Sequence, residues 1–217
     1  MDLILVGINH RSAPLEIREQ VALSDDEVRG LLSRMQKEDV LSEVLVLSTC
    51  HRTEFYGLAA DNGAAELYMR DLIDDKKRIN LERNPGYAYT LKDAETVRHL
   101  FRVAAGLDSI ILGEAQILGQ VKRAYKLAVE SRPNGVILNR LLHAAAAVGK
   151  RVRTDTRLGG GAVSLAGASA ELAGKIFRDL SSRSVLLIGV GEMGKLTARH
   201  MMERGVSRLT IANRTFS

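Results

Sequence analysis

The sequence of 217 residues contains no tryptophan, only three prolines and a single cysteine. One cysteine excludes an internal disulfide framework and is typical of a reducing compartment. Aromatic residues make up only 4% of the chain, so a core has to be packed mainly with aliphatic side chains. No apolar run approaches the roughly 18 residues that a membrane-spanning helix needs, and the first residues do not resemble a secretion signal. We therefore expect a cytoplasmic protein without a membrane anchor.

The residues that are present suit a globular protein, because 46% are hydrophobic and 26% are charged. This length predicts one large domain or two small ones. The net charge of +5 is unevenly distributed: residues 120–157 hold nine Lys or Arg and two acidic residues, a local balance of +7. A local positive excess suits a polyanionic partner such as nucleic acid, and it equally suits a solvated helix face.

The cysteine, Cys50, follows an apolar run at residues 44–47 that is typical of a buried strand. A second strand-like segment begins at Thr53, so Cys50 is predicted to lie in a turn at the edge of a sheet. His51 and Arg52 come next, and a cation near a thiol favours the thiolate, which is the nucleophilic form. The alternative is a small buried side chain, the usual role of an isolated cysteine.

Strand-like and helix-like segments alternate over roughly the first 110 residues, which predicts an α/β or α+β domain. The expected strands are 3–8, 44–49, 53–58 and 87–91, and the expected helices are 14–21, 24–35, 62–75 and 92–105. Ser24 with Glu27 three residues later forms a capping box at one helix start. Two further helices, 116–131 and 136–156, form a helical extension that carries the basic excess.

The stretch between residues 106 and 120 places polar side chains among aliphatic ones and has glycines at 106, 113 and 119. Its polar residues are Asp108, Ser109, Glu114, Gln116 and Gln120. Burying them would require hydrogen-bond partners. A substrate and a structural network are both candidate partners. No cluster of His, Cys and carboxylates has ligand spacing, so the sequence predicts no metal site.

A glycine-rich linker at 158–161 and a helix at 163–180 lead to a second unit, in which a buried parallel strand at 184–188 precedes Gly-Val-Gly-Glu-Met-Gly. A helix through residue 204 and a strand at 206–212 follow, which is the context that a dinucleotide-binding fingerprint requires. Arg214 stands where an NAD enzyme has an acidic residue, and this favours NADPH. The predicted cofactor-binding residues are Gly189, Gly191, Glu192, Met193, Gly194, Asn213, Arg214 and Thr215. Only two strands are present, so we expect an incomplete Rossmann-type unit within a fragment of a longer protein.

Three stretches occur in a fixed order: Ser-Thr-Cys-His-Arg-Thr-Glu at 48–54, Gly-Leu-Asp-Ser-Ile-Ile-Leu-Gly-Glu-Ala-Gln-Ile at 106–117, and the glycine motif at 189–194 with Asn-Arg-Thr at 213–215. With them the chain resembles the glutamyl-tRNA reductase family over essentially its whole length. The resemblance implies NADPH-dependent reduction of glutamyl-tRNA to glutamate-1-semialdehyde through a cysteine thioester, the first step of five-carbon tetrapyrrole and heme biosynthesis.

The resemblance also implies roles for individual residues. Cys50 is the expected nucleophile, and His99 is the expected acid that protonates the leaving ribose hydroxyl. The residues expected to bind the substrate are Thr49, Arg52, Ser109, Glu114, Gln116 and Gln120, with Arg52 as the natural partner of a carboxylate. The sequence departs from the family pattern at His51, where the family commonly has Asn.

The same resemblance implies a catalytic domain at 1–158 and a linker helix with a truncated NADPH-binding domain at 159–217. It further implies a homodimer formed through a C-terminal region absent from this sequence, and glutamate-1-semialdehyde aminomutase as a partner. Two rival hypotheses stay open. A plain NADP-dependent dehydrogenase would leave Cys50 without a role, and a non-enzymatic tRNA-binding module would leave the dinucleotide fingerprint without one.

Overall fold

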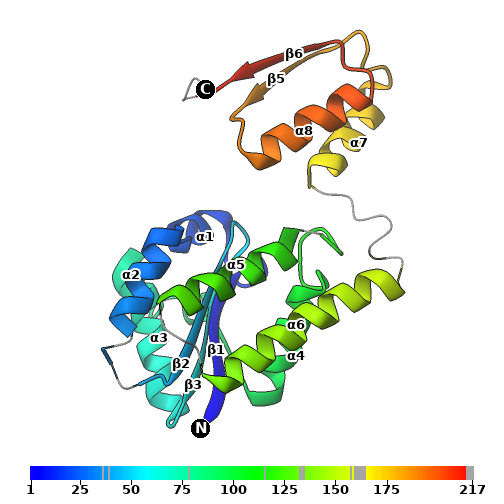
Figure 1. Ribbon diagram of the computed structural model, residues 1–217. Helices are drawn as coiled ribbons and strands as arrows, with labels where there is room; N and C mark the ends of the chain where they lie inside the picture. Colours follow the sequence, from blue (N-terminus) through cyan, green and yellow to red (C-terminus); the bar gives the residue numbers. More distant parts are fainter. Residues whose placement is uncertain are drawn as a thin grey trace. The chain divides into compact units, whose positions relative to one another are not determined.

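The computed structural model describes the whole chain except residues 36, 39, 78, 115, 132–134, 157, 159–164 and 214–217, and except the side chains at 75–77 and 192. The chain divides into two compact units, residues 1–160 and 161–217 (Figure 1). The sequence predicted a catalytic domain at 1–158 and an NADPH-binding part at 159–217. These functional assignments stay predictions.

A four-stranded antiparallel sheet in the order β2-β3-β1-β4 forms the centre of the first unit. Its strands are β1 (Asp2–Asn9), β2 (Glu43–Ser48), β3 (Arg52–Ala59) and β4 (Tyr89–Lys92). The register pairs Asn9 with Arg52 and Ser48 with Thr53, so the end of β1 and the β2–β3 turn lie at the same end of the sheet. The predicted turn at Cys50 is thus present, at the end opposite to the N-terminus of the chain (Figure 1).

Helices cover both faces of this sheet. They are α1 (Leu15–Val21), α2 (Asp25–Met35), α3 (Asn62–Lys77), α4 (Asp93–Ala104), α5 (Gln116–Ser131) and α6 (Val136–Asp155). The helix α3 packs on β1 and β3, and α4, α5 and α6 pack together on the other face, where α5 also contacts α2. Strands β1 and β3 are buried along almost their whole length because both of their faces are covered.

Local signals in the sequence account for several of these boundaries. The capping box is confirmed: the Ser24 backbone N–H donates to Glu27 Oε2 at 2.8 Å, and the Glu27 N–H donates to Ser24 Oγ at 3.3 Å. The strand expected at 87–91 begins at Tyr89, because a 3₁₀ turn at Pro85–Tyr87 takes its first residues. The buried carboxylate of Glu43 accepts N–H groups at the start of α6, including that of Leu138 at 2.6 Å, and so stabilises this helix end.

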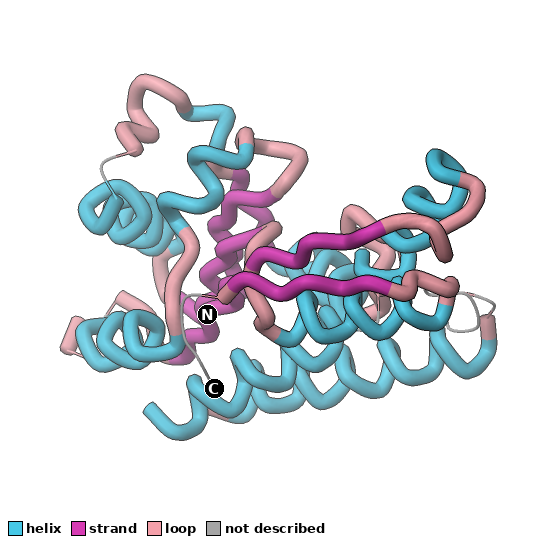
Figure 2. Tube along the Cα trace, turned by 90° about the horizontal axis from the view of Figure 1, so that it is seen from above, coloured by secondary structure: helices cyan, strands magenta, loops and turns pink. Residues whose placement is uncertain are grey.

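The second unit contains α7 (Leu165–Phe177), β5 (Ser184–Ile188), α8 (Glu192–Glu203) and β6 (Arg208–Ala212). The strands β5 and β6 pair in parallel and run side by side in Figure 2. The parallel pairing is as predicted, but the expected burial of the first strand is wrong: Leu186 is 60% exposed and Ile188 is 80% exposed. The reason is that α7 and α8 lie on one side of the two-stranded sheet, and the described residues leave its other face uncovered (Figure 1).

Both units combine helices and strands, an antiparallel α+β arrangement followed by a parallel β-α-β arrangement, so the mixed α/β fold class is confirmed. No helix among the described residues is long and apolar enough to span a membrane. The described residues also contain no group of three or more His, Cys, Asp or Glu side chains that would hold a metal ion.

Candidate active site

A tight turn between β2 and β3 presents the free thiol of Cys50 on the surface. The Thr49 N–H donates to the carbonyl of Arg52 at 2.8 Å, and the Thr49 hydroxyl accepts the N–H groups of His51 and Arg52 at 3.1 and 3.2 Å. The His10 N–H fixes the other side of the turn by donating to the carbonyl of His51 at 3.0 Å. The hydroxyl expected to bind substrate therefore also closes the turn that holds the cysteine.

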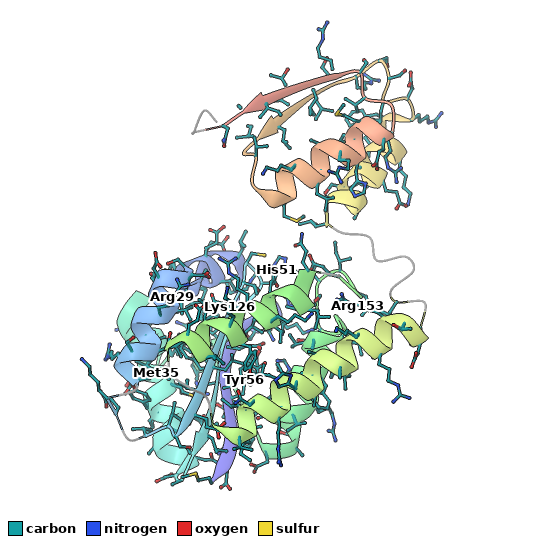
Figure 3. The ribbon with its side chains drawn as sticks, viewed as in Figure 1. Arg29, Met35, His51, Tyr56, Lys126 and Arg153 are labelled. Atoms are coloured by element: carbon teal, nitrogen blue, oxygen red, sulfur yellow. The ribbon has the colours of Figure 1, made fainter. Side chains whose placement is uncertain are left out.

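The cation that contacts this turn is Arg18, from α1. Its Nη1 atom donates to the carbonyl oxygen of Cys50 at 3.0 Å and lies 3.3 Å from Nδ1 of His51. Burial and Arg18 together lower the pKa of His51, so the ring is neutral and Nδ1 can accept from the guanidinium. Figure 3 shows His51 at the end of the unit where α5 begins, near the loop that precedes this helix.

The surroundings of the thiol raise the pKa of Cys50 instead of lowering it, mainly through burial. Partial desolvation and then the carboxylate of Glu114 raise the pKa of Cys50, and Arg18 opposes them. The expectation that Arg52 would favour the thiolate is wrong, because its side chain points into the protein and is only 1% exposed. Along a strand, successive side chains alternate between the two faces, so Arg52 enters the core.

Arg52 belongs to a buried ion network beneath the turn. Its Nη1 atom lies 2.8 Å from Oε1 of Glu54 and 3.2 Å from Oδ2 of Asp108, and its Nη2 atom donates to the carbonyl of Asp108. Asp108 is 3% exposed and also accepts from Arg11 at 2.9 Å. Asp108, one of the polar residues in the stretch at 106–120, thus has structural partners. A substrate carboxylate at Arg52 would have to share its guanidinium with Glu54 and Asp108.

Glu54 is completely buried and is the hub of this network. Besides Arg52, it accepts the phenolic O–H of Tyr56 and of Tyr89, each at 2.6 Å, and it lies 3.0 Å from Nε2 of His99. Burial alone would raise the pKa of Glu54, but Arg52 and His99 lower it well below the usual range. Glu54 is therefore ionised. Burial next to this negative charge raises the pKa of Tyr56 and of Tyr89.

An ionised carboxylate only accepts hydrogen bonds, so Nε2 of His99 must carry the proton in its contact with Glu54. That leaves Nδ1 as the nitrogen that gains and loses a proton. The Tyr89 ring packs edge-on against the His99 ring, with centroids 5.8 Å apart. The predicted acid is thus oriented by a buried carboxylate and an aromatic ring, an arrangement that suits proton transfer.

At two glycines, Gly7 and Gly113, the backbone passes so close to other groups that no side chain would fit. Gly7 pairs with Glu54 across the sheet, and a Cβ atom there would lie 2.8 Å from Cγ of Glu54 and 3.1 Å from the Tyr89 ring. In the following loop, Gly113 has a φ of +78°, and a Cβ atom there would lie 2.7 Å from the carbonyl oxygen of Leu158. A side chain at either position would displace part of the network or the loop.

The structure brings most of the predicted site residues to this end of the first unit. Thr49, Cys50 and Arg52 are on the β2–β3 turn and the start of β3, His99 is on α4, Ser109 and Glu114 are on the loop that follows α4, and Gln116 and Gln120 are in the first turns of α5. The loop is held by Arg153 of α6, whose Nη2 donates to the carbonyl of Glu114 at 2.8 Å. Ser109, Glu114, Gln116 and Gln120 are all half-buried.

Sequence reasoning did not identify Arg18, His10, Glu54 or Tyr89 as part of the site. His10 lies beside the turn, and its Nδ1 atom is buried without a hydrogen-bond partner among the described residues. One signal was present in the sequence: Arg52, Glu54 and Tyr56 recur with period two, which places three polar groups on one face of β3.

Two cations of the basic face formed by α5 and α6, Arg123 and Lys126, are held in ion pairs. Arg123 pairs with Asp25 of α2 at 2.6 Å, and Lys126 and Arg29 both pair with Glu130, at 3.7 and 3.5 Å. The helix α2 packs against α5 and contributes Asp25, which is 98 positions from Arg123 in the sequence, whereas Glu130 lies on α5 itself. The exposed cations that form no ion pair with a described residue are Lys122, Arg140 and Lys150.

The glycine turn of the second unit has the features that a dinucleotide requires. Gly189 follows β5 with a φ of +89°, Gly191 precedes α8, and a Cβ atom at either would meet nothing within 4 Å. A Cβ atom at Gly194 would instead collide with the carbonyl oxygen of Gly189. The open side of this turn faces the α8 N-terminus and fits a pyrophosphate. Met193 lies in the first turn of α8 and Asn213 follows β6, whereas Arg214, Thr215 and the side chain of Glu192 lie outside the described part.

The fold and the site define a class of protein in which an α+β domain with an exposed cysteine precedes the start of a Rossmann-type unit. The family model described as the N-terminal domain of glutamyl-tRNA(Glu) reductase matches residues 6–156, and the shikimate/quinate 5-dehydrogenase model matches residues 171–217. The glutamyl-tRNA reductase of Pelobacter propionicus is 46% identical over 217 residues, which are 100% of this chain and 50% of that protein. The chain belongs to the glutamyl-tRNA reductase family.

Two other similar proteins agree with this assignment. The glutamyl-tRNA reductase of Rubrobacter xylanophilus is 46% identical, with 99% of this chain and 50% of that protein covered. The solved structure of glutamyl-tRNA reductase from Methanopyrus kandleri has a TM-score of 0.64 and 38% identity, and the match covers 99% of this chain and 50% of that one. The chain spans about half the length of the relatives that it matches.

Proposed function

We propose that this chain provides the glutamyl-binding and acyl-transfer part of an NADPH-dependent glutamyl-tRNA reductase, the enzyme that opens the five-carbon route to tetrapyrroles. The observation that carries the proposal is the exposed thiol of Cys50 on a turn built directly above the network of Arg52, Glu54 and His99. Family membership supports the choice of an aminoacyl ester as substrate.

In the proposed reaction the Cys50 thiolate attacks the ester carbonyl carbon of glutamyl-tRNA. A carbon–sulfur bond forms, the bond to the ribose oxygen breaks, and the leaving oxygen takes a proton. His99 is the proposed donor through Nδ1, because its Nε2 proton is held by Glu54. The product of this half-reaction is a glutamyl thioester on Cys50 and free tRNA.

The raised pKa of the unliganded thiol fits this sequence of events. Glu114 is one cause of the raised value, and its carboxylate is a suitable partner for the α-ammonium group of a glutamyl residue. Neutralising Glu114 would remove an opposing charge and favour the thiolate once the cognate substrate is bound. Arg52 would recognise the substrate side-chain carboxylate, in competition with Asp108.

NADPH, when bound, supplies the hydride that converts the thioester to the aldehyde and returns the thiolate. In this chain the residues that would hold it are the glycine turn at 189–194 and Asn213, with Arg214 and Thr215 as further predicted contacts. The open space beside Gly189 and Gly191 supports the proposal that this turn binds the pyrophosphate of the cofactor. A homodimer, the aminomutase partner and a cytoplasmic location remain predictions that follow from the family.

The experiment that tests the proposal detects the thioester. The chain is incubated with glutamyl-tRNA that carries a labelled glutamyl group, quenched in acid and analysed by intact mass. We expect one glutamyl adduct on the wild-type chain and none on Cys50→Ser, since a hydroxyl without an activating base is a far weaker nucleophile than a thiolate.

Circular dichroism of Cys50→Ser serves as the control, because the exposed side chain contributes no buried contact and the fold should be unchanged. An adduct of equal yield on Cys50→Ser would overturn the assignment of the nucleophile. Free labelled glutamate in place of glutamyl-tRNA should give no adduct, and an adduct from it would instead indicate a substrate other than the ester.

A further inference from the structure

A cavity of about 380 Å³ lies directly beside the cysteine turn, between β2, α2 and α5. Thr49 and Ser48, the two residues before Cys50, form one wall, and Gln120 and Arg123 of α5 form another. Aliphatic side chains complete the lining, among them Leu23 and Val46. The volume lies in the range of small-molecule sites, roughly 300–1,000 Å³.

Most polar groups on the cavity wall already have partners. The Ser48 hydroxyl accepts the N–H of Leu23 at 2.9 Å, and the Thr49 hydroxyl is used within the turn. The exception is Gln120, whose half-buried side-chain amide makes no hydrogen bond to any residue in the described part of the chain. An amide with one donor group and one acceptor group is therefore available to a ligand.

This cavity covers only part of the predicted substrate site, because Thr49 and Gln120 line it. Arg52, Ser109 and Glu114 form no part of its lining. An ester has an acyl half and an alkoxy half, which lie on opposite sides of the carbonyl carbon that the nucleophile attacks. Cys50 follows directly after Thr49, which lines the cavity, whereas the loop that carries Ser109 and Glu114 contributes nothing to the lining. A second site next to the cysteine is therefore suited to the alkoxy half.

The helix α5 connects the two regions. Gln116, Gln120 and Arg123 are spaced at i, i+4 and i+7, so they form one row along the helix surface. The row begins next to the loop that carries Glu114 and ends at the cavity. A substrate lying along it would place its acyl group at the Gln116 end and its alcohol at the Gln120 end.

We propose that this cavity binds the 3′-terminal adenosine of the tRNA, with Gln120 reading the adenine edge. The inference rests on the proposed function, because the amino acid of an aminoacyl-tRNA is esterified to the ribose of that nucleoside. A glutamine amide pairs in two places with the amino group and ring nitrogen of adenine. The aliphatic walls around Val46 suit the faces of the base.

Arg123 completes the site at its mouth. Its side chain is 68% exposed, and its guanidinium is bound to Asp25 at 2.6 Å. A phosphate can replace that carboxylate, because a guanidinium binds both groups through paired hydrogen bonds. Arg123 thus binds the phosphate on the 5′ side of the terminal nucleoside.

The test uses small glutamyl esters with the full chain and measures the rate of adduct formation on Cys50 by intact mass. The esters are 3′-O-glutamyl-adenosine, 3′-O-glutamyl-inosine and a 3′-O-glutamyl ester of methyl riboside, which has no base. We expect adenosine to be preferred over inosine and over the riboside by about tenfold or more. Gln120→Met should reduce both preferences to within about twofold.

Gln20→Met is the matched control, because Gln20 is exposed on α1 and lies outside the cavity lining. It should keep both preferences. A second arm adds a 5′-phosphate to glutamyl-adenosine: the phosphate should accelerate acylation of the wild-type chain, and Arg123→Gln should abolish that gain.

The possible failures are distinguishable. If Cys50 is acylated by the three esters at equal rates, the adenosine site is wrong and the proposed function stands. If neither these esters nor glutamyl-tRNA acylates Cys50, the proposed function itself fails. If the preference for adenosine survives in Gln120→Met, another residue reads the base and the assignment of Gln120 is overturned.

Discussion

In the first unit the carboxylate of Glu54 is fully buried and accepts bonds from Arg52, Tyr56, Tyr89 and His99. In the second unit the described ion pairs, Glu171 with Lys175 and His200 with Glu203, lie on helix surfaces. Buried charges are retained in a fold only with complete partners, whereas exposed pairs contribute little. The first unit therefore uses charge to fix the geometry of a site, and the second uses it mainly for solvation.

Apolar packing is also more extensive in the first unit than in the second. The first unit has a continuous core on both faces of its sheet, while the buried apolar cluster of the second consists of Ala170, Leu180, Met201 and Val206. Ile188 and Ile211 of the two-stranded sheet are 80% and 50% exposed. Because a small sheet with one covered face gains little from burial, we expect the second unit to open more easily.

The largest effect is expected from Glu54→Gln, which leaves the buried Arg52 with one carboxylate partner fewer. Breaking a buried pair in this way costs about 3–5 kcal/mol. Hydrogen exchange of peptides from β1 and β3 would report the loss in that unit alone. The matched control is Glu171→Gln on α7, which should change the exchange of neither unit. Similar, small effects of both substitutions would contradict the contrast between the units.

Substitution of the charged residues near the cysteine turn of the first unit tests which of them act on the thiol of Cys50. Arg18→Gln removes a nearby cation and should raise the pKa of Cys50 further, so that alkylation by iodoacetamide at pH 7.5 slows several-fold. Glu114→Gln should do the reverse. The measurement is the alkylation rate as a function of pH.

Arg29→Gln provides the control for this experiment, because Arg29 is a surface cation of α2 that pairs with Asp26 and Glu130. It should leave the profile unchanged. A profile that shifts equally in Arg18→Gln and Arg29→Gln would mean that only the overall charge matters. Arg18→Lys, which keeps the charge, should recover most of the wild-type rate.

The smallest predicted effect is a difference in acid sensitivity. Burial and the nearby Arg52 lower the pKa of His10, so the folded state binds fewer protons than the unfolded state as the pH falls below about 6.5. The stability from neutral His10 is present above that pH and is lost as the pH falls through the lower, folded-state pKa. Between pH 7.5 and 5.5, the protection factors of the β1 amides, which correct for the intrinsic pH dependence of exchange, should therefore fall more in the wild type than in His10→Gln.

His200→Gln on α8 is the control, since its ring forms an exposed pair with Glu203 in the other unit. Exchange in β1 should keep its full pH dependence in this variant. An unchanged pH dependence in His10→Gln would assign the acid sensitivity of the first unit to other groups, such as His51.

The elements of the fold were largely predictable because short-range patterns specify them. The apolar run at 44–47 and the capping box at Ser24 depend on neighbouring residues, and both appear in the structure as expected. The burial of β5 could not be read from its sequence, because an apolar strand becomes buried only where other elements cover it. Exposure is a property of the assembled layers.

The position of Cys50 was predictable, but its electrostatic environment was not. Arg52 is adjacent in sequence, yet the strand turns its side chain toward Asp108, which lies 56 residues away. Arg18, 32 residues before the cysteine, supplies the cation that contacts the turn. The ion pair of Arg123 with Asp25, which is 98 residues away, could likewise not be read from the sequence.

The sequence separation of these contacts also bears on the order in which the site assembles. The β2–β3 hairpin closes over a few residues, whereas the bonds of Glu54 to His99 and of Arg52 to Asp108 close loops of 45 and 56 residues. Closing a longer loop has a larger entropic penalty, and hairpins form within microseconds. We therefore expect the turn that carries the exposed Cys50 to form before the buried network beneath it is complete, so that chemical damage to the thiol is a hazard during folding as well as in the native state.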